Sequence, residues 1–191
     1  MNKKIVSFAM TSVMAFALAV YAAAAEGDQS IQIGGVVSNT TSDYTLVIPT
    51  GPFTDLDLGN VGVTGELVDN LLGDVKVVRT DDTLPFDSTK RVVITTASAH
   101  GAREEGTGAL FNEAKDAYLK YELSNGSTNG DGDLIYSRVF SFHMAFSAND
   151  INNGNPKPLY LAVVDPTDTA PNGTYTDTLT FHVTPEDVPS M

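Results

Sequence analysis

An alternating stretch near the end of the chain, Gly173 to Val183, constrains the possible folds more than any other feature of the sequence. Its apolar residues share one parity, and the other parity carries threonines and one histidine. Asp177 is the only polar residue on the apolar parity. A period of two with β-branched residues on the polar side is typical of a half-buried strand. Such a strand needs neighbouring strands beside it and a second apolar layer against its buried face.

The rest of the chain contains further short segments of this kind, separated by turn residues at intervals of about ten residues, a spacing typical of β-sandwiches. We therefore predict one all-β domain, an immunoglobulin-like two-sheet antiparallel β-sandwich with one short helix at most. The other expected strands are 31–37, 44–48, 75–79, 91–97, 118–123, 134–146 and 159–164.

Two stretches of the sequence carry more detailed expectations. Residues Ala109–Ala117 have a helical composition, which favours a short helix or a loop before the strand that begins near Tyr118. In 134–146, four apolar residues from Phe140 to Phe146 share one parity, so all four are expected in the core.

The first 25 residues predict export from the cell. Lys3 and Lys4 precede an apolar run, Ile5 to Val20, and alanines 22–25 end the segment before the acidic Glu26. This order is typical of a secretory signal peptide with a small-residue cleavage site. The alternative is an uncleaved membrane anchor, but the run is short for one. We predict an exported bacterial protein of the periplasm, the cell surface or the medium, with a sandwich domain over 26–183 and a tail over 184–191.

Composition narrows the set of partners. Removing the predicted signal peptide takes away two lysines and no acidic residue, which changes the net charge from −13 to −15. Such acidity disfavours nucleic acids and anionic membranes as partners. The sequence contains no second long apolar run that would predict membrane insertion of the remaining chain. It also contains no cysteine, which excludes disulfides and thiolate chemistry.

One motif and the order of the strands resemble a known family. The motif Gly173-Thr174-Tyr175-Thr176-Asp177-Thr178-Leu179 has the form G-x-Y-x-D-x-apolar, and the strand 159–163 precedes it. Further upstream, the strand ending Tyr121-Glu122-Leu123 leads into an Asn-Gly loop. This pattern resembles the secreted spore coat protein U and archaic fimbrial (pilin-like) subunit group, in a cysteine-free variant. The likeness is diffuse over most of the chain and sharp only in the closing strand.

The resemblance implies a structural subunit that lacks one strand of its own sandwich. A neighbour's N-terminal segment would fill the gap by β-strand addition. The donated segment would be Asp28 to Val37, with Ile31, Ile33 and Val36 filling the groove. The closing strand beside the groove would contribute Gly173, Tyr175, Asp177, Leu179 and Phe181. The implied partners are copies of the chain or related surface subunits, and a periplasmic chaperone. The alternative, that 31–37 begins a complete sandwich, stays open because any all-β domain can begin with such a strand.

The best metal candidate is the Asn/Asp/Gly-rich loop 125–133, in which Asn129, Asp131 and Asp133 offer oxygen ligands to Ca²⁺. The spacing of an EF-hand is absent, and a flexible hairpin loop explains the same residues.

No combination of acid, base and nucleophile predicts an enzyme. His100, His143 and His182 lie far apart in the sequence, and no Gly-x-Ser-x-Gly elbow is present. The chain has no tryptophan, the strongest signal of a sugar-binding platform. We therefore predict an exported structural or adhesive surface subunit. The alternative is a monomeric extracellular binding module for a glycan or calcium.

Overall fold

The computed structural model describes residues 29–38, 44–48, 56, 66–79, 85–101, 107–165 and 170–188 of the 191-residue chain. The predicted signal peptide lies outside these residues. Within them, no helix has the length and apolar character needed to cross a membrane.

Nine strands make up most of the described chain. In chain order they are β1 (Gln29–Ser38), β2 (Tyr44–Val47), β3 (Asn70–Arg79), β4 (Lys90–Ser98), β5 (Gly108–Asn112), β6 (Ala117–Ser124), β7 (His143–Ser147), β8 (Lys157–Val163) and β9 (Gly173–Asp187). The described helical elements are the 3₁₀ turn η2 (Val139–Ser141) and the six-residue α-helix α2 (Ala148–Asn153). The predicted all-β class is therefore confirmed.

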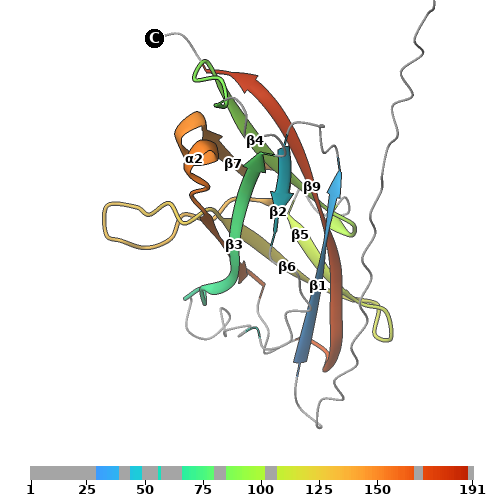
Figure 1. Ribbon diagram of the computed structural model, residues 1–191. Helices are drawn as coiled ribbons and strands as arrows, with labels where there is room; N and C mark the ends of the chain where they lie inside the picture. The colour runs from blue at the N-terminus through green and yellow to red at the C-terminus, as the bar shows by residue number, and fades with distance from the viewer. Residues whose placement is uncertain are drawn as a thin grey trace, which may run out of the picture.

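The strands follow one continuous hydrogen-bonded order, β2-β3-β8-β6-β5-β9-β4-β7, in which every neighbouring pair is antiparallel (Figure 1). β1 lies outside this order and pairs with β9 in parallel. Because the order is continuous, the division into two separate sheets stays a prediction.

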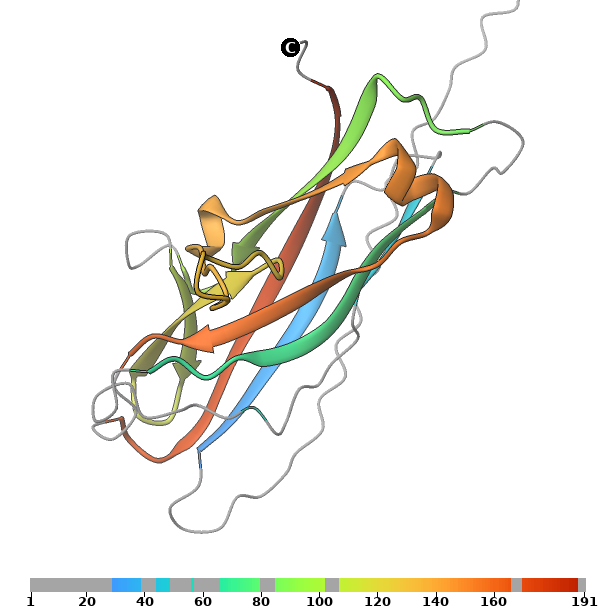
Figure 2. The ribbon, with the colours of Figure 1, turned by 90° about the vertical axis from the view of Figure 1, so that its left-hand side faces the viewer.

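Strands from both ends of this order contribute to one core. Val75 of β3 and Leu161 of β8 share the buried cluster with Ile94 of β4 and Phe146 of β7. The sheet therefore folds over its own apolar face, and Figure 2 shows β3 and β8 crossing in front of β1 and β9. Burying each large apolar side chain of this cluster stabilises the fold by about 1.5–3 kcal/mol.

The predicted helix or loop over Ala109–Ala117 is wrong. Gly108–Asn112 forms β5, residues 113–116 form a turn, and β6 begins at Ala117. The helical composition is overridden because Leu110 is fully buried in the core as part of a hairpin. Gly108 lies against the Tyr121 ring, where a Cβ atom would come within 2.2 Å of a ring carbon.

The strand predicted over 134–146 is wrong in its first part. Strand β7 begins only at His143, Leu134 and Ser137 form isolated bridges, and η2 lies between Ser137 and β7. Phe142, Met144 and Phe146 are buried as expected, but Phe140 is 64% exposed. The three-residue turn breaks the period of two, so Phe140 leaves the parity of the later residues.

The predicted tail begins later than the sequence indicates. β9 continues to Asp187, and its last residues pair with the start of β4. Lys90 lies opposite Asp187 and Arg91 lies opposite Glu186, with ion-pair distances of 3.2 and 3.0 Å. Opposite charges that face each other across two strands favour this pairing. The alternation of apolar residues ends at Val183, so it could not predict that the strand continues.

Candidate assembly interface

The structure places the predicted assembly strand directly beside the predicted closing strand. β1 and β9 pair in parallel over ten residues, from Gln29 beside Gly173 to Ser38 beside His182. These are the first and last strands of the described chain, and most of the domain separates them in sequence. A parallel pair always needs a long connection, and here nearly the whole fold provides it.

The register fixes the neighbours of the three predicted assembly residues. Ile31 lies beside Tyr175, Ile33 beside Asp177, and Val36 beside Thr180. Ile31 and Ile33 therefore share register positions with the buried parity of β9, whereas Val36 pairs with the other parity.

β1 lies along one edge of β9. Along its other edge, β9 pairs with β5 at Thr176 and with β4 from Leu179 to Asp187. Among the described strands, β1 pairs with β9 alone. Removing β1 would therefore leave the other ladders intact and expose the backbone of β9 from Gly173 to His182. An exposed strand edge of this length is a template for another strand.

The closing strand is firmly held by its buried parity. Tyr175, Leu179 and Phe181 are buried in the core, as predicted from the alternation. The Tyr175 hydroxyl donates a hydrogen bond to the Pro171 carbonyl at 2.7 Å, and burial raises the pKa of this phenol. Gly173 has a φ of 147°, and a Cβ atom there would lie 2.5 Å from the Asn112 side-chain nitrogen. Glycine is therefore required where the strand begins.

The structure explains why an acid interrupts the apolar parity at Asp177. Its side chain is fully buried and accepts three hydrogen bonds. Ser98 Oγ and Tyr121 Oη donate to Oδ2 at 2.5 and 2.6 Å, and the Thr178 amide donates to Oδ1 at 2.7 Å. His100 Nδ1 lies 3.3 Å from Oδ1 and forms an ion pair when protonated.

This arrangement is an anchor for β9. A buried carboxylate is tolerated when hydrogen bonds replace its water, and here the donors come from β4, β6 and β9. Burial and the neighbouring Asp177 charge raise the pKa of Tyr121 well above its ordinary value, so the phenol stays a donor. The Ser98 hydroxyl donates its hydrogen bond to Asp177 and not to His100. Ser98, His100 and Asp177 therefore do not form the serine–histidine–aspartate relay that activates a nucleophile.

Sequence reasoning missed the partners of Asp177. Ser98 and Tyr121 lie 79 and 56 residues away in the chain. The one available signal was the acid itself on an apolar parity, since a buried carboxylate requires donors nearby.

The predicted metal residues form a hairpin loop bonded within itself. Asn129 Oδ1 accepts the backbone amides of Asp131 and Asp133, each at 2.9 Å, and Asn129 Nδ2 donates to Asp133 Oδ2 at 3.2 Å. In the part of the chain that the structure describes, no group of three or more His, Asp or Glu side chains could hold a metal ion. These contacts favour the hairpin alternative, and calcium binding stays a prediction.

Comparisons with known proteins add no family assignment, because no protein-family model and no curated protein matches the chain.

Proposed function

We propose that this chain is an exported structural subunit that assembles with copies of itself by β-strand addition. In the assembly, β1 of one copy lies beside β9 of the next copy. The observation that carries the proposal is the parallel pairing of β1 with β9, outside an otherwise antiparallel order. The motif Gly173 to Leu179 at the start of β9 carries the resemblance to spore coat protein U and archaic fimbrial subunits, and this resemblance supports the proposal from the sequence.

The composition of β1 supports an exchangeable strand. Gly34 and Gly35 lie side by side in the middle of β1, beside Thr178 and Leu179 of β9. Glycine inside a strand weakens it, since it has no side chain to pack and loses more backbone freedom. A weakly held strand on a firmly anchored neighbour can leave and be replaced at low cost.

A vacant β9 edge needs protection before assembly. Its backbone groups would be unpaired from Gly173 to His182, and unpaired edges aggregate. We therefore include a periplasmic chaperone, which would cover this edge, among the proposed partners. Location at the cell surface or in the medium rests on the predicted signal peptide.

Deleting residues 28–37 from the mature protein tests the proposal. We expect the truncated chain to lose large assemblies in light scattering, and a synthetic peptide of residues 28–38 to bind it. The control replaces the same ten residues by a Gly/Ser sequence of equal length. If assembly size is unchanged and only the melting temperature falls, β1 is a fixed part of its own domain.

That second result would favour the alternative, a monomeric binding module. Its structural support is that β1 pairs with β9 of the same chain. Calorimetry with Ca²⁺ and with glycans would then identify the ligand.

A further inference from the structure

β7, the strand at one end of the hydrogen-bonded order, has one edge that pairs with no described strand. β7 pairs with β4 from His143 to Ser147, and no other described strand pairs with it. Alternate residues of an antiparallel strand direct their backbone groups to opposite sides, so one set of β7 residues faces away from β4. An edge of this kind, left open, would accept a strand from a second copy.

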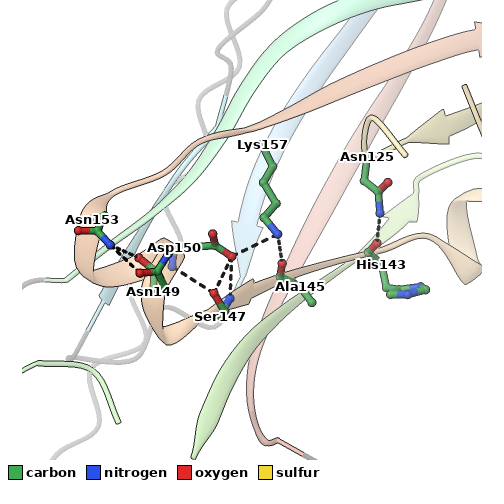
Figure 3. A network of polar contacts seen from close by, with 8 residues as sticks. All are labelled: Asn125, His143, Ala145, Ser147, Asn149, Asp150, Asn153 and Lys157. Atoms are coloured by element: carbon green, nitrogen blue, oxygen red, sulfur yellow. Dashed lines mark hydrogen bonds and ion pairs between the residues drawn. The ribbon is translucent and has the colours of Figure 1, made fainter. Parts of the chain in front are cut away.

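Three side chains bond to this edge and occupy it (Figure 3). Asn125 Nδ2 donates to the His143 carbonyl at 3.2 Å, and Lys157 Nζ donates to the Ala145 carbonyl at 2.7 Å. At Ser147, the backbone amide donates to Asp150 Oδ2 at 2.9 Å. We call Asn125, Lys157 and Asp150 the edge-capping side chains.

The edge-capping side chains are themselves held in place. Lys157 Nζ lies 3.3 Å from Asp150 Oδ2 and 5.3 Å from the centre of the Phe146 ring. Asp150 also accepts the Ser147 hydroxyl at 2.9 Å and completes the capping box of α2. Because these contacts join β7, α2 and β8, an incoming strand would have to break several of them at once.

We propose that the edge-capping side chains close β7 to strand addition, so that strand exchange between copies of this chain takes place at the β9 edge and not at β7. This inference rests on the proposed function, because it assigns a direction to that assembly. The remaining end of the order, β2, has only four residues, and very short edge strands are poor templates. Removing the caps should therefore create a second docking site, where β7 pairs antiparallel with β7 of another copy.

A single introduced thiol reports this pairing. Ala145 is the middle residue of β7, so two antiparallel β7 strands centred there place two copies of residue 145 opposite each other. The Ala145 carbonyl faces away from β4, so the two copies would form a hydrogen-bonded pair with Cα atoms about 5.5 Å apart, within the range of a disulfide. The chain has no cysteine of its own. We expect the A145C variant of the full chain to stay free of this disulfide.

Adding Asn125→Leu and Lys157→Met to A145C should produce a disulfide-linked dimer under oxidising conditions and at least double the particle mass in light scattering. The matched control is Asn153→Ala in A145C, which removes hydrogen bonds to Asn149 within α2 and leaves the β7 edge capped. With Lys157→Arg in place of Lys157→Met, a donor stays beside the Ala145 carbonyl, and the variant should return to the uncrosslinked state.

Three results would overturn the inference. The first is a disulfide dimer in A145C alone. The second is the absence of a dimer in the uncapped variant when circular dichroism shows that it is folded. The third is an uncapped variant whose particle grows although no disulfide forms. If the double substitution unfolds the protein, the milder Asn125→Ala decides the question and must give the dimer at lower yield. Deletion of 28–37 tests the β9 edge and leaves β7 untouched, so the proposed function and this inference can fail separately.

Discussion

Replacing Tyr121 by phenylalanine should destabilise the protein, because it removes one donor from the buried Asp177 carboxylate and adds nothing in its place. The two side chains share a hydrogen bond of 2.6 Å in the interior, and Tyr121 is fully buried. A hydrogen bond to a charged group contributes about 1.5–3 kcal/mol to stability. For a domain of this size, that loss lowers the melting temperature by roughly 3–12 °C.

Urea unfolding followed by circular dichroism measures the loss directly. The control is Tyr136→Phe, which removes a hydrogen bond of 2.7 Å to Asp69. Because Asp69 is exposed, water can replace the lost donor, and the free energy of unfolding should fall by less, about 0.5–1.5 kcal/mol. Ser98→Ala removes the second donor to Asp177 Oδ2, and its cost should not add to that of Tyr121→Phe, because the two donors share one acceptor atom. Equal losses for Tyr121→Phe and Tyr136→Phe would refute the anchor.

Gly173→Ala should cost more than about 1 kcal/mol, because its φ of 147° and the Asn112 amide both exclude a Cβ atom; chemical denaturation of Gly173→Ala with and without Asn112→Ala separates the two causes. Burial acts to raise the pKa of Asp150, but the Ser147 hydrogen bonds and the Lys157 charge together lower it by more. The pKa of Asp150 therefore lies below its ordinary value of 3.8. The stabilisation from Asp150 is therefore present above pH 3.8 and lost as the pH falls through the folded-state pKa, so Asp150→Asn should lower the melting temperature at pH 7 and lose its effect in strong acid. Millimolar Ca²⁺ should leave the melting temperature unchanged, since the Asn129 oxygen already accepts two backbone amides; a rise that Asp133→Asn abolishes would establish a calcium site.

The period of two in the sequence was enough to predict β9 as far as Val183 and its buried residues, because each strand residue alternates between core and solvent. It could not supply the direction of β1, since a strand carries the same pattern whether its neighbour is parallel or antiparallel. Composition was misleading at Ala109–Ala117, where a helix-forming sequence is held in a hairpin by burial of Leu110.

The candidate interface could be predicted only in part. The Gly-x-Tyr-x-Asp motif indicated that the last strand is special, but the donors to Asp177 come from segments far away in the sequence. The edge-capping side chains were equally hidden, because Asn125 and Lys157 meet β7 only after the chain has folded. Contacts of this kind depend on the fold and leave no local pattern.

The central claim is that β1 pairs with β9 of a neighbouring copy, and one disulfide measures it most directly. Gln32 and Thr176 are register partners in the parallel pair, and the chain has no other thiol to compete with introduced cysteines. Oxidation of a Gln32→Cys, Thr176→Cys variant of residues 26–191 should give a ladder of covalent multimers on a non-reducing gel. A bond formed entirely within single chains would contradict assembly by strand addition.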